Sequence, residues 1–296
     1  MIRIGSRGSP LALWQAEHVK SRLEALGHDT TIRVITTTGD RLLDARLETV
    51  GGKGAFLKEI EEALQSGEVD LAVHSLKDVP VVLPDGLALC AILERGDPRD
   101  ALLSAGSCLR ELPAGTRVGT TSLRRQSQIR ALRPDLNLVD LRGNVDSRIH
   151  KLHEGRYGAI LLALAGLVRL GRQDEVTEVL DPDHFLPAPG QGAIALECRA
   201  DDQVVKAAVA VFDHPATAAA VTAERAFLAA LGGGCNVPLG AYARPDAQGL
   251  RLSAFVGRAD GSALVRGDRT GSEPEGLGRA LAADLVARGA RELMPH

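Results

Sequence analysis

The chain has 296 residues, of which 45% are hydrophobic and 25% charged, and its formal net charge is -3. This composition is typical of a globular protein with an ample core, and the length suggests two or three domains. The slight negative charge argues against non-specific binding of nucleic acid, and a content of 3% aromatic residues argues against a base-stacking platform.

The cysteine pattern and the N-terminal residues favour a location in the cytoplasm. Cys90, Cys108, Cys198 and Cys235 are widely scattered, and no pair has the spacing of metal ligands. Such cysteines are typical of a reduced protein. The first residues enter a predicted strand without a signal-peptide core, and no apolar run is long enough to span a bilayer. We therefore expect a cytoplasmic protein with no metal and no membrane partner.

The N-terminal segment predicts a strand followed by a helix. Residues 2–5 form an apolar strand pattern, and Ser9 and Pro10 have the sequence of an N-cap and a first helical position. The loop before this helix carries Arg7 and Ser9 beside free backbone N–H groups, so it suits an anion. An ordinary strand–helix turn with a capping serine explains the same residues about equally well.

A glycine-rich stretch lies between a predicted second strand at 31–36 and a predicted helix at 57–64. Its residues Lys53, Phe56 and Lys58 favour a mobile basic loop that folds over an anionic ligand. It is not a Walker P-loop, because the lysine lies between the glycines and no Ser or Thr follows it. A solvated flexible loop is the alternative.

The stretch around Asp78 organises the rest of the chain. Residues 71–73 predict a short buried strand, and Ser75, Lys77 and Asp78 come just past its carboxyl end. In open α/β sheets, ligands bind at this end of the strands. Beside Lys77, the Asp78 carboxylate can stay ionised and meet a cationic substrate. A solvated turn is the alternative, and for this motif alone it is the commoner outcome.

A second block follows a strand at 87–93 and a charged crossover at 94–100. Strands are predicted at 101–103, 117–119, 138–141 and 159–163. Thr121 and Ser122 follow one strand, and Arg124 and Arg125 then occupy the first turn of a helix. Cations there oppose the helix dipole at a cost of about 0.3–1 kcal/mol each, so we interpret them as holding an anion.

Further arginines follow the other strands of this block. Arg142, Arg148 and Arg169 lie at or just past strand ends, where arginine favours bidentate binding of carboxylate or phosphate. Solvated surface arginines explain any one of them well, but explain the whole set poorly.

The last part of the chain predicts a return and a small third domain. A second crossover containing Gln191 leads into a strand at 193–197, which suggests that the second block is inserted and that the chain returns to the first sheet. The predicted domains are 1–94 with 193–213, 98–189, and 216–296. Cys235 lies on a glycine-rich loop of the third domain, where a buried structural thiol is the common alternative.

A series of motifs, in this order, resembles the porphobilinogen deaminase family, also called the hydroxymethylbilane synthases. The resemblance runs from Ile4 to the C-terminal helix. It rests on Gly5-Ser6-Arg7-Gly8-Ser9-Pro10-Leu11-Ala12, Gly52-Lys53-Gly54-Ala55-Phe56, His74-Ser75-Leu76-Lys77-Asp78-Val79-Pro80, Thr121-Ser122-Leu123-Arg124-Arg125-Gln126, Arg142-Gly143-Asn144-Val145, Pro187-Ala188-Pro189-Gly190-Gln191-Gly192 and Gly233-Gly234-Cys235. Gly232 and Asn236 depart from the residues common in the family, and both leave the thiol intact.

The resemblance implies an α/β fold with two lobes like those of periplasmic binding proteins, joined by a double crossover, and a small C-terminal α/β domain. It implies that Cys235 carries a dipyrromethane through a thioether. The enzyme would condense four porphobilinogen molecules head to tail on this primer, release ammonia and hydrolyse off the linear tetrapyrrole. Asp78 would stabilise the cationic intermediates, and the family is usually monomeric.

The same resemblance assigns the binding residues. The acetate and propionate groups of the pyrroles would be bound by cationic and polar side chains, and Lys53, Phe56 and Lys58 look like an active-site loop. The full set is Arg7, Ser9, Lys53, Phe56, Lys58, Ser75, Lys77, Thr121, Ser122, Arg124, Arg125, Arg142, Arg148, Arg169 and Gln191.

Two functions from other classes compete with this one. A non-catalytic two-lobed protein that binds a small organic anion would explain the crossovers and the arginines. It would not explain the third domain, the cysteine or the missing export signal. A phosphate-binding transferase would need a recognisable nucleotide loop, and the sequence contains none.

Overall fold

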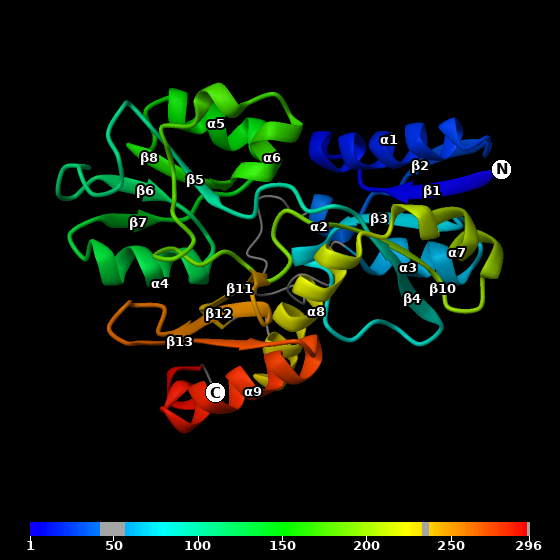
Figure 1. Ribbon diagram of the computed structural model, residues 1–296. Coiled ribbons are helices and arrows are strands. Elements are labelled where there is room, and N and C mark those ends of the chain that lie inside the picture. Colours follow the sequence, from blue (N-terminus) through cyan, green and yellow to red (C-terminus); the bar gives the residue numbers. More distant parts are fainter. Residues whose placement is uncertain (42–56, 233–236, 295–296) are drawn as a thin grey trace. The chain divides into compact units, whose positions relative to one another are not determined.

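The computed structural model describes residues 1–41, 57–232 and 237–294. These residues form two compact units, one of residues 1–96 and 192–218 and the other of residues 97–191 and 219–296. Within the described residues there are three sheets, one in the first unit and two in the second (Figure 1).

The first unit is built on a five-stranded sheet with the order β2-β1-β3-β10-β4. Its strands are β1 (Ile2–Ser6), β2 (Thr30–Val34), β3 (Leu71–Ser75), β4 (Leu87–Ile92) and β10 (Ile194–Arg199). β1, β2 and β3 are parallel, whereas β10 runs antiparallel to both β3 and β4. The strand after the second crossover therefore returns to the first sheet, as the sequence predicted.

Helices cover both faces of this sheet. α1 (Pro10–Ala25) and α7 (Gln203–Val209), which continues into a 3-10 turn at Ala210–Phe212, share a core with one face, and α3 (Lys58–Gln65) packs on the other. Figure 1 shows α1 and α3 on opposite sides of the strands. α1 buries Ala16, Val19 and Leu23 because steps of three and four residues place them on one side of the helix.

The strand before Asp78 is longer than the sequence predicted. It continues through His74 and Ser75, which pair with Ala195 and Ile194 of β10. The prediction stopped at residue 73 because the partner strand lies far away in the sequence and supplies the ladder. A 3-10 turn, Leu76–Asp78, then places Asp78 immediately beyond the end of the strand.

Asp70 joins three strands of the first unit, and its substitution should alter acid stability. It accepts hydrogen bonds from Arg3 (Nη2–Oδ1 2.7 Å) and Arg199 (Nη2–Oδ1 3.1 Å). Burial alone would raise the pKa of Asp70, but the hydrogen bonds from Arg3 and Arg199 outweigh it and lower the pKa to about 2. A lowered pKa stabilises the fold above pH 4, and this stabilisation is lost as the pH falls from about 4 to 2.

We therefore expect Asp70→Asn to reduce the free energy of unfolding at pH 7 by about 1–2 kcal/mol, a value that allows for solvent screening. The difference from the wild type should nearly vanish at pH 2. Urea denaturation at several pH values measures both quantities, and Asp29→Asn, at an exposed position, is the control. A constant difference across the pH range would contradict this account.

The second unit contains a sheet with the order β7-β6-β8-β5-β9. Its strands are β5 (Asp100–Ser104), β6 (Arg117–Gly119), β7 (Asn137–Val139), β8 (Ala159–Ala163) and β9 (Glu178–Val179). β6, β7 and β8 are parallel, and β5 runs antiparallel to β8 and β9. α4 (Leu123–Leu132) packs on one face, and α5 (Val145–His153) and α6 (Leu164–Arg169) pack on the other.

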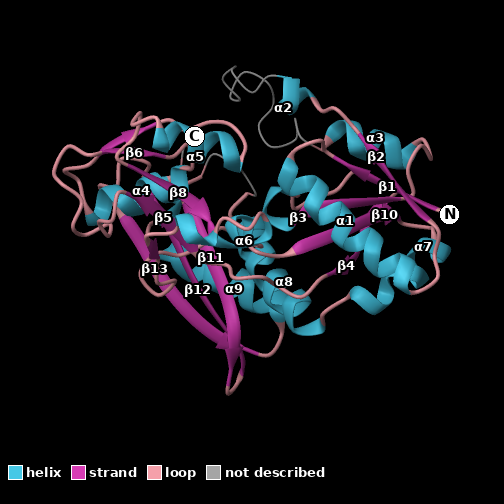
Figure 2. Cartoon of the chain, turned by 90° about the horizontal axis from the view of Figure 1, so that it is seen from above, coloured by secondary structure: helices cyan, strands magenta, loops and turns pink. Residues whose placement is uncertain are grey.

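The C-terminal part has its own antiparallel sheet, β11 (Leu239–Asp246), β12 (Gly249–Gly257) and β13 (Leu264–Gly271). One face packs against α8 (Pro215–Ala230) and α9 (Pro274–Ala287), with Phe227, Leu252 and Leu281 in the core. Figure 2 shows these long strands beside α9. Together with the two α/β sheets and the double crossover, this small domain confirms the predicted fold class.

The remaining short elements are α2 (Thr38–Arg41) and 3-10 turns at Gln173–Glu175 and Ala290–Leu293. None of the described helices is on its own long and apolar enough to cross a membrane. Only the pair 203–212 and 215–230, taken together as a bent span, meets the criteria of length and composition.

Candidate active site

Asp78 and Arg7 lie at the same edge of the sheet in the first unit. Because β1, β2 and β3 are parallel, their carboxyl ends meet there, and Arg7 follows β1 while Lys77 and Asp78 follow β3. Ser9 caps α1 beside Arg7, accepting a hydrogen bond from the backbone N–H of Ala12 at 3.4 Å. Arg7, Lys77 and Asp78 thus gather at the expected edge, with Ser9 beside them.

Arg7 has a carboxylate partner that the sequence did not reveal. Asp40, on α2, forms an ion pair with Arg7 and accepts a hydrogen bond from the Thr37 hydroxyl at 2.7 Å. Burial alone would raise the pKa of Asp40, but Arg7 and Thr37 outweigh it and lower the pKa. In this structure, one anion beside Arg7 is therefore a carboxylate of the chain itself.

Ser75 is oriented by a buried glutamine. Gln15 is only 2% exposed, and its Nε2 donates to Ser75 Oγ at 2.9 Å. Gln15 lies among the residues of α1 that face the sheet. A buried amide on this apolar face is the only feature of the sequence that indicates a polar partner for it. It fixes the hydroxyl at the end of β3, three residues before Asp78.

A buried acidic cluster lies on the other face of β3. His74 Nε2 lies 2.8 Å from Glu197 Oε2, and both side chains are buried. Burial and the charge of Glu197 raise the pKa of Glu61, and His74 partly offsets this effect. No local sequence pattern indicates this cluster, because its members come from three separate elements.

Three predicted site residues, Lys53, Phe56 and Cys235, lie outside the described residues. Lys58 is described: it begins α3, its side chain is exposed, and its Nζ lies 3.8 Å from Glu62 Oε1, one turn along the helix. The structure therefore gives Lys58 a solvent-facing position and a weak intrahelical ion pair.

In the second unit, the carboxyl ends of β6, β7 and β8 also meet at one edge. Thr121 and Ser122 follow β6, Arg142 follows β7, and Arg148 and Arg169 lie in the helices after β7 and β8. Thr121 Oγ1 donates to the carbonyl of Leu141 at 3.5 Å, which joins the two neighbouring loops.

The turn after Arg142 requires glycine. Gly143 has a φ of +114°, and a Cβ atom there would collide with the side chain of Ser147. This turn brings the chain directly from β7 into α5, whose N-cap Asn144 accepts from the backbone N–H of Ser147 at 2.9 Å. Arg142 and Arg148 are thereby held at the same edge.

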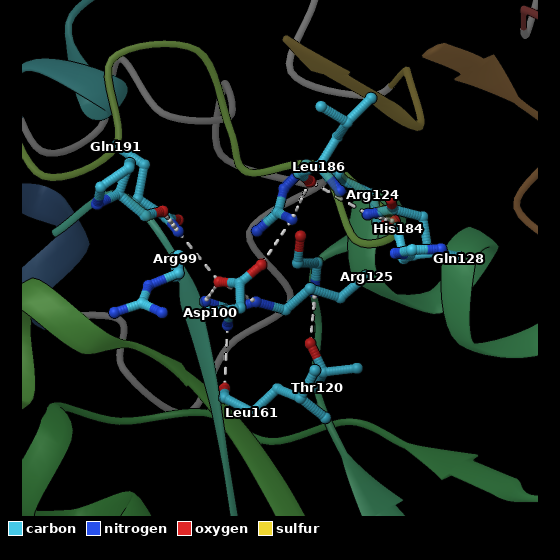
Figure 3. Close-up of polar contacts among 12 residues, drawn as sticks. Arg99, Asp100, Thr120, Arg124, Arg125, Gln128, Leu161, His184, Leu186 and Gln191 are labelled. Carbon is cyan, nitrogen blue, oxygen red and sulfur yellow. Dashed lines mark hydrogen bonds and ion pairs between the residues drawn. The ribbon is translucent and has the colours of Figure 1, made fainter. Parts of the chain in front are cut away.

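Arg124 and Arg125 converge on the carboxylate of Asp100, the last residue of the predicted charged crossover. Arg124 Nη1 and Arg125 Nη2 each lie 2.6 Å from one of its oxygens (Figure 3). Gln191 Nε2 also donates to Asp100 Oδ1, at 3.0 Å. Asp100 is fully buried, and both arginines are at most 6% exposed.

Asp100 corrects the interpretation of the helix dipole. The two arginines at the start of α4 were interpreted as holding an anion, and this internal carboxylate supplies one negative charge to them. Burial alone would raise the pKa of Asp100, but the charges of Arg124 and Arg125 outweigh it and hold the pKa far below its usual range. Burial also lowers the pKa of Arg124. Arg124 Nε is buried without a hydrogen-bond partner among the described residues, so this cluster retains one unused donor.

Arg169, like Arg124, is desolvated by burial. Burial lowers the pKa of Arg169 to about 10, so the guanidinium remains charged at neutral pH. No group of three or more His, Cys, Asp or Glu residues within 1–41, 57–232 and 237–294 is arranged to hold a metal ion. The carboxyl edges of the two α/β sheets carry mainly cationic hydrogen-bond donors among the described site residues, and such donors suit carboxylates.

Two family models match the chain. One describes the "Porphobilinogen deaminase, dipyromethane cofactor binding domain" and matches residues 2–207, and the other describes the "Porphobilinogen deaminase, C-terminal domain" and matches residues 218–287. The unpartnered Nε of Arg124 and the cationic edge fit a cofactor that carries carboxylates.

Relatives named porphobilinogen deaminase match over nearly the whole chain. The protein of Roseiflexus castenholzii is 52% identical, covering 99% of this chain and 98% of its own length. The protein of Geobacter sulfurreducens is 50% identical, covering 99% and 93%.

Among solved structures, a periplasmic substrate-binding protein of an ABC transporter from Coxiella burnetii is 15% identical and covers 74% of this chain and 94% of its own. The TM-score of this match is 0.45. The family models and the relatives both indicate an enzyme. The alternative of a non-catalytic two-lobed binding protein is therefore wrong. The chain belongs to the porphobilinogen deaminase family, transferases of porphyrin biosynthesis that act on porphobilinogen with a dipyrromethane cofactor.

Proposed function

We propose that the chain joins four porphobilinogen molecules head to tail on a dipyrromethane attached to Cys235, and releases ammonia and the linear tetrapyrrole hydroxymethylbilane. The observation that carries this proposal is the set of cationic side chains at the carboxyl edge of each α/β sheet, with Asp78 at the edge in the first unit. We further propose a cytoplasmic monomer without a nucleic-acid partner: the scattered cysteines support the location, the net charge of -3 argues against nucleic acid, and the family is usually monomeric.

Charge complementarity supports the binding part of the proposal. Each pyrrole unit carries an acetate and a propionate, so the growing product is a polyanion. Arg7, Arg142, Arg148 and Arg169 would bind these carboxylates, with Thr121 and Ser122 as further hydrogen-bond donors. The dipyrromethane, when bound, supplies the pyrrole carbon to which the first substrate is joined.

The chemistry of the substrate gives Asp78 its role. When the carbon–nitrogen bond of porphobilinogen breaks, both bonding electrons leave with ammonia, and the remaining methylene-pyrrolenine is a cation. The Asp78 carboxylate, beyond the end of β3, would stabilise this cation and the pyrrole N–H groups. After the new carbon–carbon bond has formed, the same carboxylate would help to remove the proton displaced from the acceptor ring.

Arg142→Leu tests the proposal. The wild-type protein is expected to consume porphobilinogen and release ammonia and a linear tetrapyrrole. Arg142→Leu should retain the circular dichroism of the wild type. It should raise KM, or lower the rate of substrate addition, by about tenfold or more, because a charge-assisted hydrogen bond to a carboxylate is lost. Ammonia release and mass spectrometry of the stalled species measure both effects.

Arg156→Leu is the matched control, since Arg156 is exposed and precedes β8, at the opposite edge of the same sheet. Unchanged KM and turnover in Arg142→Leu would remove Arg142 from the site. A wild-type protein that releases no ammonia from porphobilinogen would refute the proposed function.

A further inference from the structure

Asp100 occupies a defined place at the proposed carboxylate-binding edge of the second unit. It is the first residue of β5, and it pairs with Ala163, the last residue of β8. Because β5 runs antiparallel to β8, its first residue lies at the edge where β6, β7 and β8 end. A fully buried aspartate therefore lies among the arginines that would bind the substrate.

The two oxygens of Asp100 have different partners. Oδ1 accepts from Arg125 Nε at 3.1 Å and Nη2 at 2.6 Å, and from Gln191 Nε2 at 3.0 Å. Oδ2 accepts from Arg124 Nη1 at 2.6 Å. Arg125 and Gln191 thus fix the orientation of the carboxylate, and its second oxygen is left to hold Arg124 (Figure 3).

The guanidinium groups also differ. Every nitrogen of Arg125 is engaged, because Nη1 donates to the carbonyl of Leu161 at 2.8 Å. Both hydrogen bonds of Arg124 run from Nη1, one to Asp100 and the other to the carbonyl of Leu186 at 2.7 Å. Arg124 Nε has no partner among the described residues. Nε and Nη2 share the other side of the guanidinium, which is the side that binds a carboxylate bidentately.

Charge completes the argument. Arg124 and Arg125 carry two positive charges and Asp100 carries one negative charge, so one positive charge remains within a buried cluster. One carboxylate of a ligand would neutralise it. Without Asp100 the cluster would hold two uncompensated charges, and the two guanidinium groups would repel each other.

We propose that Asp100 is a positioning residue: by holding Nη1 of Arg124 it leaves the Nε side of the guanidinium without a protein partner among the described residues, and it sets the cluster to accept a single carboxylate of the substrate chain. This rests on the proposed function, in which cationic side chains at this edge bind the carboxylates of the substrate chain, and it adds Arg124 to them. Asp100 itself touches no substrate atom, and it acts through Arg124.

Asp100→Asn is the first test. The amide removes the negative charge and can accept from only one of the two arginines. In the purified holoenzyme, KM for porphobilinogen is expected to rise at least tenfold while kcat changes less, or the dipyrrole adduct is lost from a folded chain. Asp100→Glu, which keeps the charge, should recover part of the loss. A purely structural role would lower the folded fraction, and with it the apparent kcat, but would leave KM unchanged.

Asp97→Asn is the matched control, because Asp97 lies three residues earlier and pairs with Arg99 at 2.6 Å instead. Its KM should stay within twofold of the wild type. Arg124→Lys keeps the charge and the contact with Asp100 but removes the bidentate side of the guanidinium. It should raise KM at least tenfold with a near-normal melting temperature, and it tests the proposal even if Asp100→Asn does not fold.

An Asp100→Asn protein with a full dipyrrole load and unchanged KM, or an Arg124→Lys protein with unchanged KM, would overturn the proposal. Failure of the proposed function has a different signature. In that case the wild-type protein itself consumes no porphobilinogen and carries no dipyrrole, whatever the variants do.

Discussion

Asp78→Asn is expected to lower turnover by roughly a hundredfold or more while leaving the fold and the bound cofactor intact. The amide keeps the shape of the side chain but offers no full negative charge to the cation formed when ammonia leaves. Asp78 ends a 3-10 turn beyond β3, so the substitution should change the free energy of unfolding by less than about 0.5 kcal/mol. Steady-state ammonia release measures turnover, and intact mass measures the cofactor.

Asp85→Asn is the control for this experiment. It makes the same chemical change in the same unit, at an exposed turn before β4. Its turnover should equal that of the wild type. Near-normal activity in Asp78→Asn would remove Asp78 from the mechanism, whereas equal losses in both variants would indicate a general effect of charge.

The second large effect is expected for Cys235→Ala, which should yield a folded, colourless and inactive apo-protein. A thiolate is a strong nucleophile towards the carbon cation that porphobilinogen forms on losing ammonia, so the site could install its own primer. Intact-mass spectrometry of the wild type should show one dipyrrole adduct per chain, and peptide mapping should place it on Cys235. Ehrlich's reagent should colour the wild type and not the variant.

The other cysteines provide the controls, and their surroundings are poor for alkylation. Cys198 is fully buried on β10. The hydrogen bond with Cys198 and burial both raise the pKa of Cys90. Partial burial and the carboxylates of Glu178 and Glu111 raise the pKa of Cys108. Alanine at each of these three positions should leave the adduct in place. An adduct on one of them, or an active Cys235→Ala enzyme, would overturn the assignment.

The sequence predicted the elements whose signals are local. Ser9 and Pro10 mark the start of α1 by capping and by the fixed φ of proline, and the structure begins the helix there. The apolar runs that became β4, β5, β6 and β8 were predicted within about two residues of their bounds. The return of β10 to the first sheet followed from the two crossovers.

Features that depend on distant partners were not predicted. Asp100 lies four residues past Gly96, where the first segment of the first unit ends, and nothing near it in sequence reveals that two arginines of α4 will surround it. The same holds for Gln15 with Ser75 and for Asp40 with Arg7, because each pair forms only when separate elements meet at one edge. β9 has two residues, too few for any periodic pattern.

Part of the proposed site stays a prediction of the sequence. Lys53, Phe56 and Cys235 lie outside the described residues, and the roles of the arginines rest on the resemblance and on charge complementarity. The division into three domains, the cytoplasmic location and the monomeric state are likewise predictions.

The strand order of the first unit also bears on biosynthesis. Among the described strands, β4 pairs only with β10, because it lies at the end of the order β3-β10-β4. During translation, β4 is made about a hundred residues before β10. It therefore has no partner strand while the inserted residues 97–191 are synthesised. The inserted lobe can therefore complete its sheet first, and the N-terminal lobe closes around the returning strand afterwards.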